Sequence, residues 1–364
     1  MRYLTLRYLL FVFFVIALWL APSSSRAAKG LEIYFIDTEG GAATLIVSPA
    51  GESTLIDNGN PGERDADRIF RTAQRAGLKQ IDNLIITHWH LDHYGGTAAL
   101  ARKIPIKRFY DHGIPEVSID DPTHFPTLIA AYKEASKGKS VQLNPGDKVP
   151  LAQAGGVPLE LRCLVARRET VPDRSDASKN GFARANVPMP EDPSDNANSL
   201  GFLLTYGNFR FIDLGDLTWN IEYKLVSPTD KIGFVDVYQS THHGLDISNN
   251  PVLIKTIRPM VAIYNNGPHK GGAPALTATL RDIGSLQGIF QMHRNLDAKP
   301  EDNAAAELIA NAEDTANCKG EGIALSVAPN GDSYTVQVGS HGKPLKFETR
   351  FHANKIVTNK IVKE

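Results

Sequence analysis

The sequence has few cysteines and almost no net charge. Only Cys163 and Cys318 occur among 364 residues, and no Cys-x-x-Cys pair exists, which excludes a four-thiolate zinc site. The 39 basic and 40 acidic residues leave a formal net charge of −1. This balance disfavours a nucleic-acid binder that relies on a strongly basic body. No Walker A motif, dinucleotide-binding glycine fingerprint or Gly-x-Ser-x-Gly elbow is present.

One apolar run stands out, from Leu9 to Leu20, after two arginines and before a stretch of small residues. This pattern predicts a secretory signal peptide over residues 1–27 and a secreted or periplasmic protein. The run is short for a membrane span of ~20 residues, and the alternative is an uncleaved amino-terminal anchor. Export implies an oxidising compartment, where Cys163 and Cys318 can pair if their positions allow it, which the sequence leaves open.

Alternating strand and helix signals predict one domain of mixed α/β layers over residues 28–340. The predicted strands are 31–37, 44–48, 53–57, 81–87, 200–206, 209–214, 235–239, 261–264, 323–327 and 334–338, and the predicted helices are 65–76, a helix starting at 97–102, and 273–283. The polar stretch 167–198 predicts an insertion, either a lid over a site or a surface loop. Residues 341–364 are expected to form a weakly structured carboxyl-terminal tail.

Four ligand-type side chains crowd into the six residues His88-Trp89-His90-Leu91-Asp92-His93, where a predicted strand ends. Residues two apart in a strand share a face, so we expect His88 and His90 to bind one ion together. Asp92 and His93 then reach a second ion. Imidazole and carboxylate suit zinc, manganese or iron. Two ions ~3.5–4 Å apart bridge a hydroxide and stabilise the leaving oxygen, which predicts a metal-dependent hydrolase.

Other strand ends supply the remaining candidates. Asp216 follows the predicted strand 209–214 and is expected to bridge both ions, with Asp213 as its competitor. His243 is expected to bind the second ion, and its neighbour His242 is a candidate proton donor or substrate contact. Asp57 ends an early strand, and we expect it to orient one of the histidines from behind.

The pattern His88-x-His90-x-Asp92-His93, with Asp57 upstream and Asp216 and His243 downstream, resembles the metallo-β-lactamase superfamily of hydrolases. Within it, the chain is most similar to the hydrolase domain of the competence protein ComEC. That likeness spans roughly residues 31–338 and includes Asn196–Leu200 and Asn265–His269. The resemblance implies an α+β fold, the four-layer αββα sandwich of the metallo-β-lactamases, with the metals at one edge.

Two departures from that family are visible. The chain reads Asp37-Thr38-Glu39-Gly40-Gly41-Ala42 and lacks the acidic residue that usually ends this motif. The superfamily's additional histidine on a middle strand is also missing, and Asn198 stands near its expected place. We therefore expect an amide such as Asn198, or water, beside the first ion. The expected cofactors are two divalent ions, zinc first, with manganese or iron as alternatives.

The resemblance favours a phosphodiester substrate, since the similar branch includes nuclease-like domains. We expect a metallo-hydrolase that uses a metal-bridged hydroxide, in which Asp92 also shuttles a proton. His242 or His269 then protonates or holds the leaving group. The expected partner is a small-molecule or polymer ester rather than nucleic acid. The alternatives are a lactone, lactam or thioester hydrolase, and a non-catalytic binding protein stabilised by metal; the oligomeric state stays open.

Overall fold

The computed structural model describes residues 29–173, 178–314 and 318–351. The predicted leader, residues 1–27, lies outside these ranges, as do residues 352–364 of the predicted tail. Within the described ranges, none of the helices combines the length and the apolar character that a membrane span requires.

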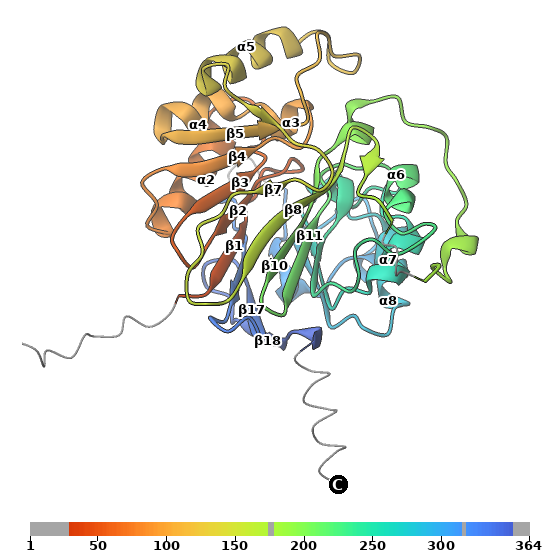
Figure 1. Ribbon diagram of the computed structural model, residues 1–364. Helices are drawn as coiled ribbons and strands as arrows, with labels where there is room; N and C mark the ends of the chain where they lie inside the picture. Colours follow the sequence, from red (N-terminus) through yellow and green to blue (C-terminus); the bar gives the residue numbers. More distant parts are fainter. Residues whose placement is uncertain (1–28, 174–177, 315–317, 352–364) are drawn as a thin grey trace, which may run out of the picture.

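Two sheets form the centre of the molecule (Figure 1). The first has the order β18-β17-β16-β1-β2-β3-β4-β5-β6, and the second has the order β15-β14-β13-β12-β11-β10-β8-β7, with β9 paired to β8. Strands of the first sheet are β1 (Leu31–Phe35), β2 (Thr44–Val47), β3 (Ser53–Ile56), β4 (Ile81–Ile85), β5 (Ile106–Asp111), β6 (Val141–Gln142), β16 (Ile323–Val327), β17 (Ser333–Val338) and β18 (Leu345–Glu348). Strands of the second are β7 (Lys148–Val149), β8 (Leu159–Ala166), β9 (Glu169–Thr170), β10 (Gly201–Tyr206), β11 (Phe209–Asp213), β12 (Val237–Gln239), β13 (Val261–Tyr264), β14 (Gly288–His293) and β15 (Ile309–Asn311).

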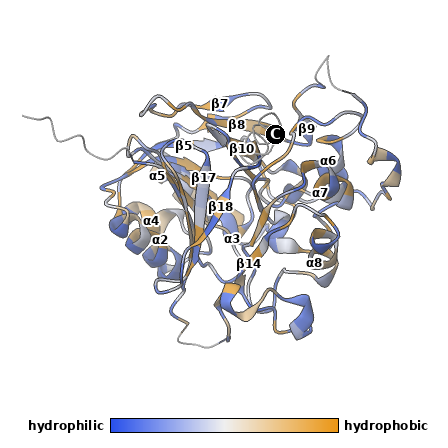
Figure 2. Ribbon diagram, turned by 90° about the horizontal axis from the view of Figure 1, so that it is seen from below, coloured by the Kyte–Doolittle hydropathy of each residue, from blue (hydrophilic) through white to orange (hydrophobic). Residues whose placement is uncertain are grey.

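Helices cover the outer face of each sheet. The first sheet carries α2 (Glu63–Arg75), α4 (Thr97–Lys103) and α5 (Phe125–Ser136), and the second carries α6 (Trp219–Lys224), α7 (Pro251–Ile257) and α8 (Pro274–Arg281). Three separate apolar layers result, one between the sheets and one under each set of helices. Hydrophobic colour follows the inner strands, and the helices show hydrophilic outer surfaces (Figure 2). This is the four-layer αββα sandwich that the resemblance implied.

The strongly patterned elements occur where the sequence predicts them, with ends that differ by a few residues. The predicted tail differs, because β18 pairs with β17 in register and places Phe347 in the core between the sheets. Its run Leu345–Glu348 has only one buried side chain, so its pattern is too weak to predict a strand. Strand β8, which pairs with β10, was also missed.

The direction of the strands determines where polar side chains gather. Strands β3, β4 and β5 run parallel in the first sheet, and β11, β12, β13 and β14 run parallel in the second. Because parallel strands end at the same edge of a sheet, the residues that follow them meet there. These are the segments that contain Asp57, the histidine motif, Asp216 and the His242-His243 pair.

The layer between the sheets should dominate stability. Leu204 on β10 is fully buried in that layer. We expect Leu204→Ala to lower the free energy of unfolding by about 2–5 kcal/mol, since it removes apolar contacts and leaves a cavity. Urea unfolding measures the change. Val141→Ala, at a half-exposed site on β6, is the control and should change stability by less than about 0.5 kcal/mol.

Candidate metal centre

The histidine motif lies just after a strand, as the sequence predicts, in a loop and a single helical turn. Strand β4 ends at Ile85, and α3 (Leu91–Tyr94) begins two residues after Trp89. The carboxylate of Asp57 holds the end of this strand, because it accepts hydrogen bonds from the backbone nitrogen and the hydroxyl of Thr87 at 2.8 and 2.7 Å. Trp89 is buried and packs against Tyr94 and Tyr132.

Four imidazoles converge on one oxygen of Asp216. The Nε2 atoms of His93, His243, His242 and His88 lie 3.2, 3.2, 3.4 and 3.9 Å from Asp216 Oδ2. All five side chains are buried. They come from three strand ends in two sheets, so only the packing of the sheets brings them together.

A second carboxylate, Asp92, lies at the more open side of the cluster. Its Oδ2 is 3.6 Å from His243 Nε2 and 3.9 Å from His93 Nε2. Two sets of three ligand atoms are compact enough to surround one ion each. These sets are His88, His93 and Asp216, and Asp92, His93 and His243.

The outer nitrogens of three of these histidines face oxygen acceptors. His93 Nδ1 is 2.7 Å from Asp57 Oδ2, and His243 Nδ1 is 3.3 Å from the carbonyl oxygen of Asn265. His88 Nδ1 is 3.1 Å from the Thr87 hydroxyl, which donates its own proton to Asp57 and therefore accepts here. When each imidazole is neutral, these acceptors favour the proton on Nδ1, and the lone pair of Nε2 then faces the cluster.

This arrangement fits divalent metal ions. Lone pairs on nitrogen and carboxylate oxygens face each other in a dry interior, where they repel unless a cation lies between them. His88 Nε2 and Asp216 Oδ1 are buried and have no hydrogen-bond partner in the described part of the chain. A buried polar atom without a partner is costly, and a metal ion would satisfy both atoms. Imidazole and carboxylate donors suit zinc, manganese and iron.

Burial and neighbouring groups shift the pKa values of the cluster. Burial and the neighbouring His93 and His90 hold the pKa of His88 well below its usual value. Burial opposes the charged form of Asp216, yet His243, His93 and His242 hold the pKa of this carboxyl well below its usual value. A deprotonated carboxylate beside a neutral imidazole is the state in which both bind metal.

Some predicted residues lie apart from this cluster. His90 is close to His88, with ring centroids 4.6 Å apart, but its Nε2 faces Asp120 Oδ2 at 3.2 Å. Asp213, the competitor of Asp216, instead contacts the Gln239 amide, and burial raises the pKa of its carboxyl to about 7.

The loop candidates also differ from expectation. His269 is exposed and pairs with Asp297 and Asp314 at the surface, so the structure does not bring it to the cluster. Asn198 hydrogen-bonds Asp195, whose carboxylate accepts the backbone N–H of Trp89 at 2.7 Å. Asn198 therefore supports the motif only through Asp195 and does not contact the histidines.

Two residues at the cluster are not among those predicted from the sequence. The ammonium of Lys270 lies 2.5 Å from Asp92 Oδ2, whereas the sequence predicts a role for its neighbour His269. Asn196 is buried, and its amide nitrogen lies 3.5 Å from His242 Nε2. Asn196 belongs to a segment that resembles the ComEC branch, and Lys270 directly follows another such segment; only the turn geometry shows which side chain faces inward.

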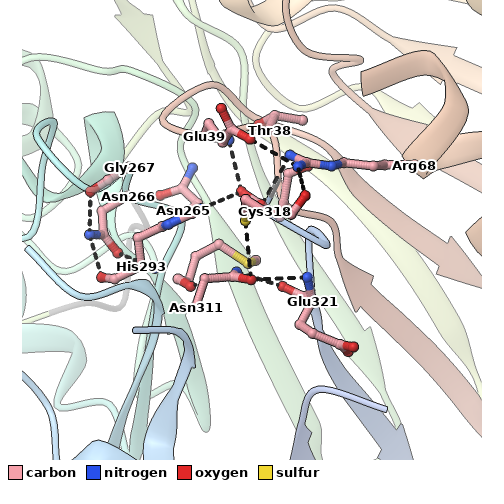
Figure 3. A network of polar contacts seen from close by, with 12 residues as sticks. Thr38, Glu39, Arg68, Asn265, Asn266, Gly267, His293, Asn311, Cys318 and Glu321 are labelled. Carbon is pink, nitrogen blue, oxygen red and sulfur yellow. Dashed lines mark hydrogen bonds and ion pairs between the residues drawn. The ribbon is translucent and has the colours of Figure 1, made fainter. Parts of the chain in front are cut away.

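A separate polar network follows β1 (Figure 3). Asp37 lies 2.7 Å from His293 Nε2 and 3.0 Å from the Arg68 guanidinium, with the Cys318 thiol 3.9 Å away. These are ligand-type groups, but Arg68 already supplies the positive charge that the buried carboxylate requires. The network therefore anchors the loop after β1. Cys318 is not paired with Cys163, which lies in the core between the sheets.

The contact between Asp57 and His93 gives a test of the site. Asp57→Ala removes the acceptor that fixes the tautomer of His93, so we expect affinity for Zn²⁺ or Mn²⁺ to fall about 10–100-fold. Competition with a chromophoric chelator measures the affinity. Asp82→Ala is the matched control, since this carboxylate bonds Ser53 near the other end of β4. Unchanged affinity in the Asp57 variant would contradict the assigned role.

Comparisons with known proteins agree with the fold. Residues 36–160 match the family model of the metallo-β-lactamase superfamily. The ComE operon protein 3 of Bacillus subtilis (strain 168) is 27% identical over 198 residues, which cover 54% of this chain and 21% of that protein. The lactamase-like protein notP of an Aspergillus species (strain MF297-2) is 35% identical over 65 residues, 18% of this chain and 20% of that protein. The chain spans about a fifth of the length of these curated relatives.

Among solved structures, CmlA, a diiron β-hydroxylase from Streptomyces venezuelae, aligns with a TM-score of 0.39 at 17% identity. The alignment covers 66% of this chain and 45% of that one. The matched segment 36–160 contains Asp57 and the whole histidine motif. Over this segment, the chain is similar to the metallo-β-lactamase superfamily.

Proposed function

We propose that this protein is an exported, metal-dependent hydrolase of phosphodiesters. His88, His93, Asp92, Asp216 and His243 hold two divalent ions, zinc being the expected metal, and His90 joins them when it leaves Asp120. Such ions, when bound, supply a nucleophilic water at neutral pH and positive charge for the leaving oxygen. The chain's own residues then bind and orient the substrate.

The choice of substrate rests on the position of Lys270. Its ammonium contacts Asp92 within the cluster, yet the side chain is 40% exposed and can meet a molecule arriving from solvent. A phosphodiester carries one negative charge on the group that is attacked, whereas a lactone or thioester carries none there. A fixed cation beside the ligands therefore favours an anionic reacting group.

The loop that holds Lys270 has little freedom. A side chain on Gly271, whose φ is +82°, would meet the carbonyl oxygen of His243 at 2.0 Å. Gly40 lies against the aliphatic part of Lys270, and a side chain there would come within 3.3 Å of it. These close approaches fix the ammonium relative to His243, so that its charge is positioned before substrate arrives.

We expect Lys270→Met to raise KM for bis-p-nitrophenyl phosphate at least tenfold, because the variant keeps the length of the side chain but loses its charge. Hydrolysis of the uncharged ester p-nitrophenyl acetate is the internal comparison and should change much less. Steady-state kinetics with added Zn²⁺ or Mn²⁺ measures both. Lys107→Met, which removes a half-exposed lysine paired with Asp82, is the matched control.

The same assay separates the alternatives. If the wild type cleaves lactones or thioesters but no phosphodiester, the substrate belongs to the acyl class. A protein that binds two ions and hydrolyses neither class would support the metal-stabilised binding protein instead.

Export is the second part of the proposal. It rests on the basic residues and apolar run before residue 28, and it fits an extracellular or periplasmic small-molecule or polymer ester as substrate better than nucleic acid. Amino-terminal sequencing of the protein recovered from outside the cytoplasm should begin near Ala28. Recovery of an intact Met1 in the membrane fraction would indicate the anchor instead.

A further inference from the structure

The additional middle-strand histidine that the superfamily resemblance leads us to expect is not evident in this chain. His242 lies in the cluster and is buried, with Nε2 3.4 Å from Asp216 Oδ2. We propose that His242 is a metal ligand that supplies this imidazole, beside His88 and Asp216. The proposal rests on the metal centre described above and is independent of the substrate.

The backbone explains how two adjacent histidines reach one carboxylate. His242 and His243 both adopt left-handed conformations, with φ of +52° and +56°. Two consecutive non-glycine residues in this region are unfavourable and persist only where surrounding structure fixes them, typically at functional sites. Here the N–H of His242 donates to the carbonyl of Gly215, and its own carbonyl accepts from Leu245. This turn brings both Nε2 atoms within 3.4 Å of Asp216 Oδ2.

The hydrogen bonds around His242 determine its tautomer. Its Nδ1 lies 3.3 Å from the hydroxyl of Ser248, and that hydroxyl donates its proton to the carbonyl of Leu217 at 2.7 Å. Ser248 therefore accepts from His242, and the imidazole proton is on Nδ1. Nε2 is left with a lone pair directed at Asp216, which is repulsive unless a cation lies between them.

The position of this proton distinguishes two roles for His242, a metal ligand and a proton donor. A donor to the leaving group would need its proton on Nε2, the nitrogen that faces the cluster. The other neighbour of Nε2, the amide nitrogen of Asn196, is at 3.5 Å, the outer limit of a hydrogen bond. The arrangement matches His93 and His88, whose outer nitrogens also donate to oxygen acceptors. The geometry thus favours coordination over the proton-donor role expected from the sequence.

Metal counting tests the proposal without a substrate. The full chain and its variants are dialysed against limiting Zn²⁺ or Mn²⁺ and analysed for bound metal, and affinities are measured by chelator competition. We expect two ions in the wild type. His242→Gln should keep one ion and bind the other at least tenfold more weakly. Ser248→Ala preserves the imidazole but removes its acceptor, so it should weaken the same ion about tenfold. His293→Gln, at a buried histidine of the Asp37 network, is the control and should keep both ions.

Cobalt substitution counts the ligands directly. Each coordinating imidazole with a proton on Nδ1 gives a hyperfine-shifted, exchangeable N–H resonance in the NMR spectrum of the Co²⁺ protein. His242→Gln should remove one such resonance, and Ser248→Ala should shift or broaden it. If both variants keep two ions at wild-type affinity and the full set of resonances, His242 is not a ligand. A wild type that binds no metal would overturn the metal centre itself, whereas absent phosphodiesterase activity would leave this proposal intact.

Discussion

The site depends on one electrostatic constraint, the convergence of four imidazole nitrogens on a single buried oxygen of Asp216. In water, such a carboxylate and such lone pairs would each be hydrated. Buried at the edge of the two sheets, they repel one another unless positive charge lies between them, from a metal ion or from an imidazole proton. Burial opposes the charged form of His93, yet the neighbouring carboxylates raise the pKa of this imidazole well above its usual value. A buried histidine with a purely structural role would carry a proton on the nitrogen that faces the carboxylate. Here the acceptors behind the rings, which are Asp57, Thr87, Asn265 and Ser248, favour a proton on the outer nitrogen Nδ1 instead.

The fold supplies two of those acceptors, Asp57 and Asn265, from distant parts of the chain. Asp57 follows β3 and holds both the loop that carries His88 and the ring of His93. Asn265 follows β13 and fixes the ring of His243. Because the parallel strands of both sheets end at one edge, His93 and His243 each have their supporting group on a neighbouring strand end. Loss of one supporting contact should therefore weaken metal binding without unfolding the sandwich.

The same edge combines rigidity with access. His88, His93 and His243 are fully buried, whereas Asp92 and Lys270 are partly exposed. Buried ligands would hold the ions rigidly, and the open side leaves a carboxylate and an ammonium where a substrate can arrive. The glycines around Lys270 allow its loop to approach His243 closely. On the proposed function, recognition of an anion would be built into the metal centre rather than added by a separate pocket.

The sequence by itself determined the residue types, the resemblance to the metallo-β-lactamase superfamily and the strongly patterned elements. The motif His88–His93 is dense enough in ligands to indicate metal, and Asp57, Asp216 and His243 follow predictable strand ends. Only the tertiary structure decided which neighbour faces inward: Lys270 rather than His269, Asn196 rather than Asn198, and both histidines of the 242–243 pair. The reason is that these residues lie in loops, where side-chain direction follows individual φ values and distant hydrogen bonds rather than any periodicity along the chain.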